Sequence, residues 1–174
     1  MSDLAGGEGS GNSANLTEVL YLQVSQFLFR EAEVLDTRAF DRWIDLWQAD
    51  DITYWVPCNS DDGDVRNSLS IILDDREHLE ERVSRLLDKK AHTFQPQPRT
   101  QRLVGNICIE EICGNEIVAT SIFSLAQTHR ERHSFWFGRS RHELLVQADK
   151  ILIRKKKVCL LNNDDAMPNL LFLP

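Results

Sequence analysis

Apolar residues recur at three- and four-residue steps in the first part of the chain, which is the spacing of one face of a helix. This stripe consists of Leu16, Leu20, Val24, Phe27, Leu28 and Leu35. Asn15 and Glu18 form a capping-box pattern just before it, and Thr37 is placed to cap a second, short helix. The pattern therefore predicts a first helix from about residue 16, followed closely by another.

The segment from Asp41 to Cys58, DRWIDLWQADDITYWVPC, mixes tryptophans and a tyrosine with aspartates. Aromatic rings beside carboxylates occur in small-molecule pockets, but also where a helix packs on a sheet. Trp43 and Trp47 share one apolar stripe at helical spacing, and the run over residues 52–56 is β-branched and aromatic, as in a strand. We therefore expect a joint between helix and sheet, with Tyr54 kept as a candidate pocket residue.

A short strand over residues 68–73 and a third helix over residues 74–90 come next. After them the hydrophobic period changes from helical to two. Four strands follow, over residues 102–111, 116–130, 135–146 and 150–161. Helices first and a long antiparallel sheet afterwards predict an α+β fold in which the helices cover one face of the sheet.

The 174 residues are enough for one domain with a substantial core. Residues 1–15, rich in Gly, Ser and Asn, predict a disordered tail, and residues 16–174 a single domain. The net charge of −7 argues against binding to a phosphate backbone, so we expect no nucleic-acid partner. No apolar run reaches the roughly 20 residues that cross a bilayer, so we expect no membrane span.

The four cysteines form no CxxC pair and no zinc-ligand spacing, which favours a cytoplasmic chain with reduced thiols. None is followed by histidine at the Cys-x-His or Cys-x-x-His distance, so the sequence lacks the ligands of a Rieske cluster. His129 and His133 are four residues apart, but they straddle a predicted strand end and turn, which favours polar rim residues over metal ligands.

The run Arg154 to Lys157 lies inside an apolar strand pattern. Alternation places Lys155 and Lys157 on one face with Ile153, and Lys156 on the other face with Val158 and Leu160. We favour a solvated or edge-protecting strand end over a contact with an acidic partner protein.

GxGxxG, Walker and GxSxG motifs are absent from the sequence. One chemistry that remains open is an acid–base pocket in the mouth of a cone-shaped α+β fold. Its candidate residues are Asp51, Tyr54, His129 and His142. For Asp51, ordinary turn chemistry is the simpler interpretation.

Several segments in a fixed order resemble the small (beta) subunit of aromatic-ring-hydroxylating dioxygenases. They are the Asp41–Cys58 region with Glu31, Leu35 and Asp36 before it, then DDREHLEERVSRL, PRTQRLVGNICIEE, FWFGRSRHELL and IRKKKVCLLNND. The resemblance runs from about Leu16 to the end. The chain departs from the family pattern in two places. Pro98 and Arg102 stand where the family commonly has serine and histidine, and Asp149-Lys150 stands where the last strand usually begins near a tryptophan.

The resemblance implies a cone-shaped fold of the nuclear-transport-factor and scytalone-dehydratase type, with N-terminal helices on a strongly curved, mostly antiparallel six-stranded sheet. It implies a chain without catalytic residues or cofactors of its own. The large (alpha) subunit would hold the Rieske cluster and the mononuclear iron, and the small subunits would form a trimer within an α3β3 hexamer that adds O₂ to an aromatic substrate. Candidate subunit contacts are Arg99, Arg102, Asn106 and Arg141.

Two other functions remain open from the sequence. One is a stand-alone isomerase or dehydratase on the same fold, which requires an open pocket with two converging titratable groups. The other is a ligand-binding domain without an acid–base pair.

Overall fold

The computed structural model describes residues 9–59, 64–88, 96–148, 150–165, 170 and 172–174, with side chains from residue 16 onward. Its helices are α1 (Gly9–Asp36), α2 (Phe40–Ile44) and α3 (Arg76–Leu87). Its strands are β1 (Thr53–Pro57), β2 (Ser70–Asp74), β3 (Arg99–Cys113), β4 (Glu116–His129), β5 (Arg132–Gln147) and β6 (Lys150–Leu160). None of the described helices is long and apolar enough to cross a membrane.

The described strands form one six-stranded sheet in the order β2-β1-β6-β5-β4-β3. Strands β3 to β6 pair antiparallel with their sequence neighbours, which confirms the predicted meander. β1 lies parallel to β6, and β2 pairs antiparallel with β1. The predicted α+β fold with a mostly antiparallel six-stranded sheet is therefore confirmed, and β1–β6 is its parallel pair.

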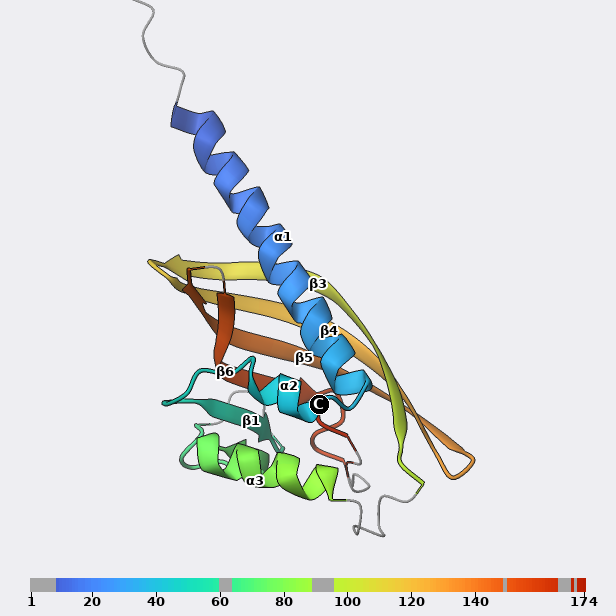
Figure 1. Ribbon diagram of the computed structural model, residues 1–174. Coiled ribbons are helices and arrows are strands. Elements are labelled where there is room, and N and C mark those ends of the chain that lie inside the picture. Colours follow the sequence, from blue (N-terminus) through green and yellow to red (C-terminus); the bar gives the residue numbers. More distant parts are fainter. Residues whose placement is uncertain (1–8, 60–63, 89–95, 149, 166–169, 171) are drawn as a thin grey trace, which may run out of the picture.

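The long strands curve around a concave inner face that α1 crosses diagonally (Figure 1). Register shifts between Gly105 and Cys108 in β3, and at Arg154 in β6, mark bulges. A bulge bends its strand and increases the local twist, so these irregularities help the sheet to curl. Below, the inner face is the side of the sheet towards α1, and the outer face is the opposite side.

Helix α1 begins at Gly9, inside the segment predicted as a disordered tail over residues 1–15. The helix therefore starts earlier than the expected residue 16, and residues 1–8 lie outside the described part. Once a helix is nucleated, each further residue extends it at little cost, so the capping pattern at Asn15 need not stop it. The first half of α1 projects beyond the sheet (Figure 1), and the second half buries Val24, Phe27, Leu28 and Leu35.

The Asp41–Cys58 region is a joint between helix and sheet, as predicted. The rings of Trp43, Trp47 and Tyr54 are all buried and meet edge to face, with centroids 5.4–5.8 Å apart. Two details differ from the prediction. Helix α2 ends at Ile44, so Trp47 lies outside it and forms a parallel bridge with β6. Thr37 does not cap α2, because its hydroxyl donates to the Glu33 carbonyl at the end of α1.

A bulge at Arg154 changes the alternation predicted for β6. Glu143 pairs with Lys155 and the next residue, Leu144, pairs with Ile153, so Arg154 is the extra residue. Ile153 is therefore buried on the same side as Lys156, not opposite to it. Strict alternation cannot locate such a bulge, because the extra residue reverses the parity from that point on.

Candidate functional site

Polar side chains from neighbouring strands form one row across the inner face. Backbone pairing places His142 of β5 opposite Lys156 of β6, and Lys156 opposite Tyr54 of β1. All three side chains are buried. The sheet order, in which β1 lies beside β6, therefore brings together residues that are far apart in the sequence.

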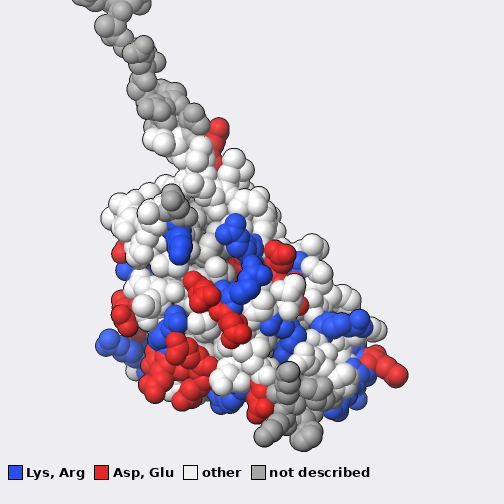
Figure 2. Space-filling view, in the orientation of Figure 1, with Lys and Arg blue, Asp and Glu red and all other residues white. Residues whose placement is uncertain are grey.

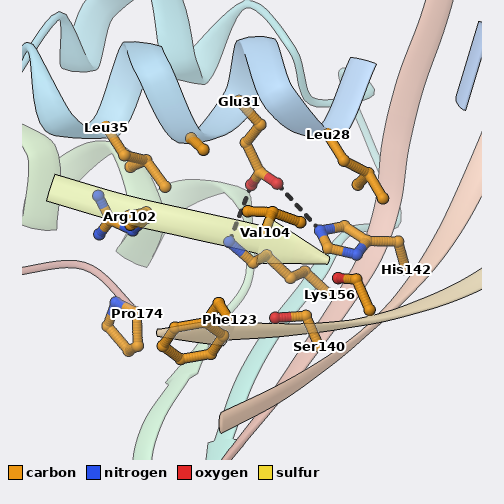
Figure 3. A pocket seen from close by; sticks show the side chains of 12 residues that line it. Leu28, Glu31, Leu35, Arg102, Val104, Phe123, Ser140, His142, Lys156 and Pro174 are labelled. Carbon is orange, nitrogen blue, oxygen red and sulfur yellow. Dashed lines mark hydrogen bonds and ion pairs between the residues drawn. The ribbon is translucent and has the colours of Figure 1, made fainter. Parts of the chain in front are cut away.

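Glu31 of α1 reaches down to this row and connects it to the helix (Figure 3). Its Oε1 accepts hydrogen bonds from Lys156 Nζ at 2.9 Å and from Trp43 Nε1 at 3.0 Å. Its Oε2 lies 3.0 Å from His142 Nε2. This buried carboxylate has three partners, which is the condition under which a buried charge is tolerated.

The partners of Glu31 determine its charge. Burial alone would raise the pKa of Glu31, but attraction from Lys156 and His142, together with their hydrogen bonds, holds it well below its usual range. Burial lowers the pKa of Lys156, and Glu31 opposes that shift. Because the ionised Glu31 can only accept, His142 Nε2 must carry a hydrogen. In a neutral His142 ring, Nδ1 is then an acceptor, and it has no hydrogen-bond partner within the described residues.

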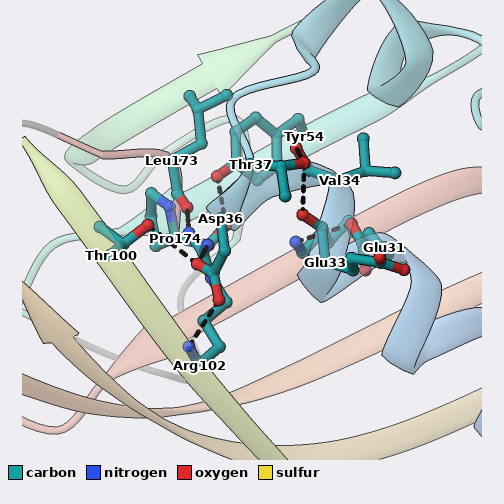
Figure 4. A network of polar contacts seen from close by, with 11 residues as sticks. Glu31, Glu33, Val34, Asp36, Thr37, Tyr54, Thr100, Arg102, Leu173 and Pro174 are labelled. Carbon is teal, nitrogen blue, oxygen red and sulfur yellow. Dashed lines mark hydrogen bonds and ion pairs between the residues drawn. The ribbon is translucent and has the colours of Figure 1, made fainter. Parts of the chain in front are cut away.

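A second polar network lies just beyond Glu31, at the C-terminal end of α1 (Figure 4). Asp36 accepts from the Arg102 guanidinium, from the Arg102 backbone N–H at 2.6 Å and from Thr100 Oγ1 at 2.8 Å. The Arg102 guanidinium also donates to the carbonyl oxygen of Leu173. Arg102 is thus held between the end of α1 and a segment near the end of the sequence.

That segment, Phe172–Pro174, is buried inside the cone. Tyr54 donates its hydroxyl to the Pro174 main-chain oxygen at 2.6 Å, and the Phe172 ring lies 5.2 Å from the Trp136 ring, centroid to centroid. Burial raises the pKa of Tyr54, so its hydroxyl stays protonated and serves as a donor. The segment therefore contributes one ring and two main-chain oxygens to the interior.

The space left between these groups is a cavity of about 20 Å³. Its polar wall includes Glu31, Arg102, His142 and Lys156, and Pro174 closes it on one side. A volume of this size holds about one water molecule. With Phe172–Pro174 in place, the titratable groups converge on a space too small for an aromatic ring.

The structure separates the four predicted pocket residues into two pairs. Tyr54 and His142 belong to the buried row described above. Asp51 is exposed in the turn before β1, with a φ of 53°, and His129 is half-buried at the end of β4; neither lines the cavity. Turn chemistry thus accounts for Asp51, and a position at the strand end accounts for His129.

The predicted subunit contacts also differ in exposure. Arg99 and Asn106 are exposed on β3, and Arg141 is partly exposed beside Glu143 at 3.0 Å. Arg102 is not available at the surface, because it is buried and paired with Asp36. The alternating pattern of β3 places Arg102 on the inner face, one residue from the exposed Leu103.

Glu31, Asp36 and Lys156 were not among the predicted site residues. A signal existed for Glu31, which falls on the apolar stripe of α1 between Leu28 and Leu35. A charge at a core position of a helix indicates a buried partner. The sequence does not identify that partner, because Lys156 is 125 positions away.

The solvated interpretation of Arg154–Lys157 is wrong for Lys156, and the other cations also have partners within the chain. Arg154 contacts Glu116 at 2.8 Å and Glu143 at 3.1 Å, and Lys155 contacts Glu143 at 3.2 Å. Lys157 Nζ lies 4.6 Å from the centre of the Trp55 ring. Internal pairing thus accounts for a run that the sequence alone leaves open to an acidic partner.

The outer face of the sheet is apolar across several strands. Pairing places Leu103 of β3, Ser124 of β4 and Phe137 of β5 in one row, and the Leu161 N–H bonds to the Phe137 carbonyl. Phe135 lies two residues from Phe137 on the same face. Leu103, Phe135, Phe137 and Leu161 are 73%, 69%, 49% and 78% exposed, and they define the outer apolar face referred to below.

Metal ligands do not gather in the described part of the chain. No group of three or more His, Cys, Asp or Glu side chains there is placed to hold a metal ion. The polar groups of the inner face are instead bound to one another.

Comparison with known proteins agrees with this arrangement. The family described as "Ring hydroxylating beta subunit" matches residues 30–164. The chain is 33% identical over 151 residues to the 2-halobenzoate 1,2-dioxygenase small subunit of Burkholderia cepacia, covering 84% of this chain and 91% of that one. It is 31% identical over 148 residues to the anthranilate 1,2-dioxygenase small subunit of Acinetobacter baylyi, covering 83% and 91%.

Solved structures show the same fold. The beta subunit of benzoate 1,2-dioxygenase from Burkholderia mallei superimposes with a TM-score of 0.72 and 27% identity, covering 86% of this chain and 95% of that one. A proposed scytalone dehydratase from Novosphingobium aromaticivorans gives 0.61 at 12% identity, covering 86% and 87%, and so shows the fold alone. The scytalone-dehydratase type of fold is therefore confirmed, and the chain belongs to the beta-subunit family of the ring-hydroxylating dioxygenases.

Proposed function

We propose that this chain is the structural small subunit of a multicomponent dioxygenase that adds O₂ to an aromatic substrate. Membership of a small-subunit family implies a large partner subunit. In this proposal the large subunit carries the Rieske cluster, the mononuclear iron and the catalytic residues. The present chain assembles and stabilises the large subunits in the cytoplasm.

The observation that carries the proposal is the outer apolar face on a chain of this family. Monomeric proteins rarely expose contiguous apolar areas of this kind, and such areas mark association surfaces. The projecting half of α1 adds another, with Leu16, Val19 and Leu22 exposed. Figure 2 shows the described part of that half, from residue 16, as an almost uncharged surface, whereas acidic side chains gather near the start of α3.

We propose a trimer of small subunits within an α3β3 hexamer. A closed ring of three chains can cover the same apolar surface on each copy, which an open arrangement cannot do. Arg99, Asn106 and Arg141 remain proposed contact residues. Arg102 is not among them, because it is buried.

The substrate is proposed to be an aromatic acid. The relatives above are named for 2-halobenzoate and anthranilate, and others for p-cumate and benzoate. These are benzene rings that carry a carboxylate. A stand-alone isomerase or dehydratase is not supported, since with Phe172–Pro174 in place the cavity of about 20 Å³ has no room for a ring.

Light scattering on the purified chain, alone and co-expressed with its proposed large subunit, tests the proposal. Three chains of 20.0 kDa give a trimer of about 60 kDa. The co-expressed sample should elute as one complex with equal numbers of the two chains and with iron in the large one. A small chain that stays monomeric and does not copurify with the large chain would contradict the proposal.

A further inference from the structure

The segment Phe172–Pro174 lies in the cone as a bound ligand would. Arg102 donates to the Leu173 carbonyl, Tyr54 donates to the Pro174 oxygen, and Trp136 packs against the Phe172 ring. On the side of the segment, each of these contacts is made by a main-chain oxygen or by an aromatic ring. The interior therefore recognises the segment through general features that a small molecule can also present.

The groups that contact the segment are held in place by the sheet. Arg102, Leu125 and Trp136 form one row of paired residues on the inner face, so the guanidinium and the indole flank a single leucine. Tyr54 is fixed among the tryptophan rings. Sites on rigid strands keep their geometry when a ligand leaves, so the cone should remain formed without the segment.

A guanidinium, a phenol hydroxyl and an indole together match one class of ligand. Arg and Tyr donors pair with the two oxygens of a carboxylate, and the indole packs against a ring. The match is an aromatic carboxylate, in which the ring replaces Phe172 and the carboxylate oxygens replace those of Leu173 and Pro174.

The charges around the cavity are already paired, so the ligand's carboxyl group needs a further partner. Arg102 of β3 is paired with Asp36, and Lys156 of β6 is paired with Glu31 of α1, so these groups have no net charge to offer an anion. His142 of β5 supplies the missing partner. Its Nδ1 is buried and unpartnered in the described structure and His142 lines the cavity, so this nitrogen can accept the hydrogen of a carboxylic acid group.

We propose that the cone of this subunit is a binding site for an aromatic carboxylate, which Phe172–Pro174 occupies as an internal, displaceable ligand. This site goes beyond the structural role proposed above and does not depend on the large subunit. In the intact chain the tethered segment competes at an effective concentration in the millimolar range, so a free acid binds weakly.

A chain that ends at residue 171 tests the proposal directly. Benzoate is titrated against the truncated and the full-length chains. Binding is followed by calorimetry and by the fluorescence of the buried Trp43, Trp47 and Trp136. We expect the truncated chain to bind benzoate at least tenfold more tightly than the full-length chain. Toluene, which has the ring without the carboxylate, should bind more weakly than benzoate.

The peptide acetyl-Phe-Leu-Pro is the control for the integrity of the site. Because it restores the missing segment in trans, it should bind the truncated chain and displace benzoate. A truncated chain that binds the peptide but not benzoate overturns the proposal. So does a folded truncated chain that binds neither.

Two point variants test whether benzoate binding uses the Tyr54 hydroxyl and the space of the Phe172 ring. Tyr54→Phe in the truncated chain removes one donor, and it should weaken benzoate binding about tenfold while leaving toluene binding unchanged. Phe172→Gly in the full-length chain frees the space of one ring without truncation. If the truncated chain does not fold, this variant decides: benzoate should bind it more tightly than the unaltered chain, and equal affinities contradict the site.

The pH dependence separates uptake into the cone from surface binding. Because the paired charges leave no net positive charge for an anion, the acid enters the cone with one proton, and above the pKa of free benzoic acid its affinity falls about tenfold for each added pH unit. Binding to a surface cation should be nearly flat over the same range. Light scattering on the same variants reports assembly separately, so a failure of benzoate binding is distinguishable from a failure of the proposed subunit role.

Discussion

Lys156 Nζ lies 2.9 Å from Glu31 Oε1, and the two side chains are only 4% and 5% exposed. The pair joins α1 to the centre of the sheet, since β6 lies between β1 and β5. A buried ion pair is often no more stabilising than a well-packed apolar pair, but breaking it leaves an uncompensated charge. Substitution of one partner should therefore be far more harmful than substitution of both.

Lys156→Met should lower the free energy of unfolding by about 3–5 kcal/mol, because Glu31 keeps its charge and loses its strongest partner. Urea denaturation measures the loss. Lys155→Met is the matched control on the same strand. Lys155 is about half-exposed, so the loss should stay below about 1 kcal/mol.

The effect of Glu31→Gln on stability should change sign according to whether Lys156 is present. It destabilises the unaltered chain, in which it leaves Lys156 without a carboxylate. It stabilises Lys156→Met, in which it removes the unpaired charge. If Glu31→Gln destabilises both backgrounds equally, the two residues are not coupled and the ion pair does not hold the helix on the sheet.

The pH dependence of stability should also report Glu31. Its pKa is lower in the folded chain than in the unfolded chain, so the unfolded state binds more protons between the two values and stability falls as the pH falls. The stabilisation is complete above the unfolded pKa of about 4.3 and is lost by up to about 1.4 kcal/mol for each pH unit below it.

Unfolding curves at pH 7, 5 and 3.5 test this expectation for the unaltered chain and for Glu31→Gln. The difference in unfolding free energy between the two should be constant from pH 7 to 5 and should shrink at pH 3.5. Parallel pH profiles down to pH 3.5 would show that Glu31 has an ordinary pKa in the folded chain.

Local patterns predicted the elements well, because most elements are defined by their own periodicity. The α1 stripe and the alternation in β4 each follow from one buried face, so the helix and the strand could be recognised without knowing their neighbours. The start of α1 was missed because capping residues favour an end without enforcing one.

The site could be predicted only in part, because its members meet through non-local pairing. Tyr54 and His142 were identified as polar or aromatic residues with potential chemistry, but the parallel contact of β1 with β6 that places Lys156 between them leaves no trace in periodicity. The role of Phe172–Pro174 was also missed. Short terminal segments have no period, and only the tertiary structure shows what they contact.

Gly138→Ala should destabilise the fold, because the inner face has no room for a methyl group at that position. An added Cβ would lie 2.7 Å from the Cys159 carbonyl oxygen and 2.7 Å from the Phe123 ring. Overpacking of this kind costs about 1–3 kcal/mol. Gly105→Ala is the control, since nothing lies within 4 Å of its added Cβ. Thermal unfolding should show a lower Tm for Gly138→Ala and no loss for Gly105→Ala; equal losses would contradict the packing described.

Phe137→Asp should weaken the proposed self-association without unfolding the chain. Phe137 lies in the centre of the outer apolar face, between Ser124 of β4 and the exposed Leu161. A charge there would have to be desolvated on assembly, and loss of a central aromatic contact typically costs at least about 2 kcal/mol, or roughly 30-fold in Kd.

Leu69→Asp is the matched control, because Leu69 is equally apolar and exposed but precedes β2 at the other edge of the sheet. Sedimentation velocity should show dissociation for Phe137→Asp and an unchanged assembly for Leu69→Asp, with circular dichroism unchanged in both. The opposite result would move the interface from the outer apolar face to the β2 edge.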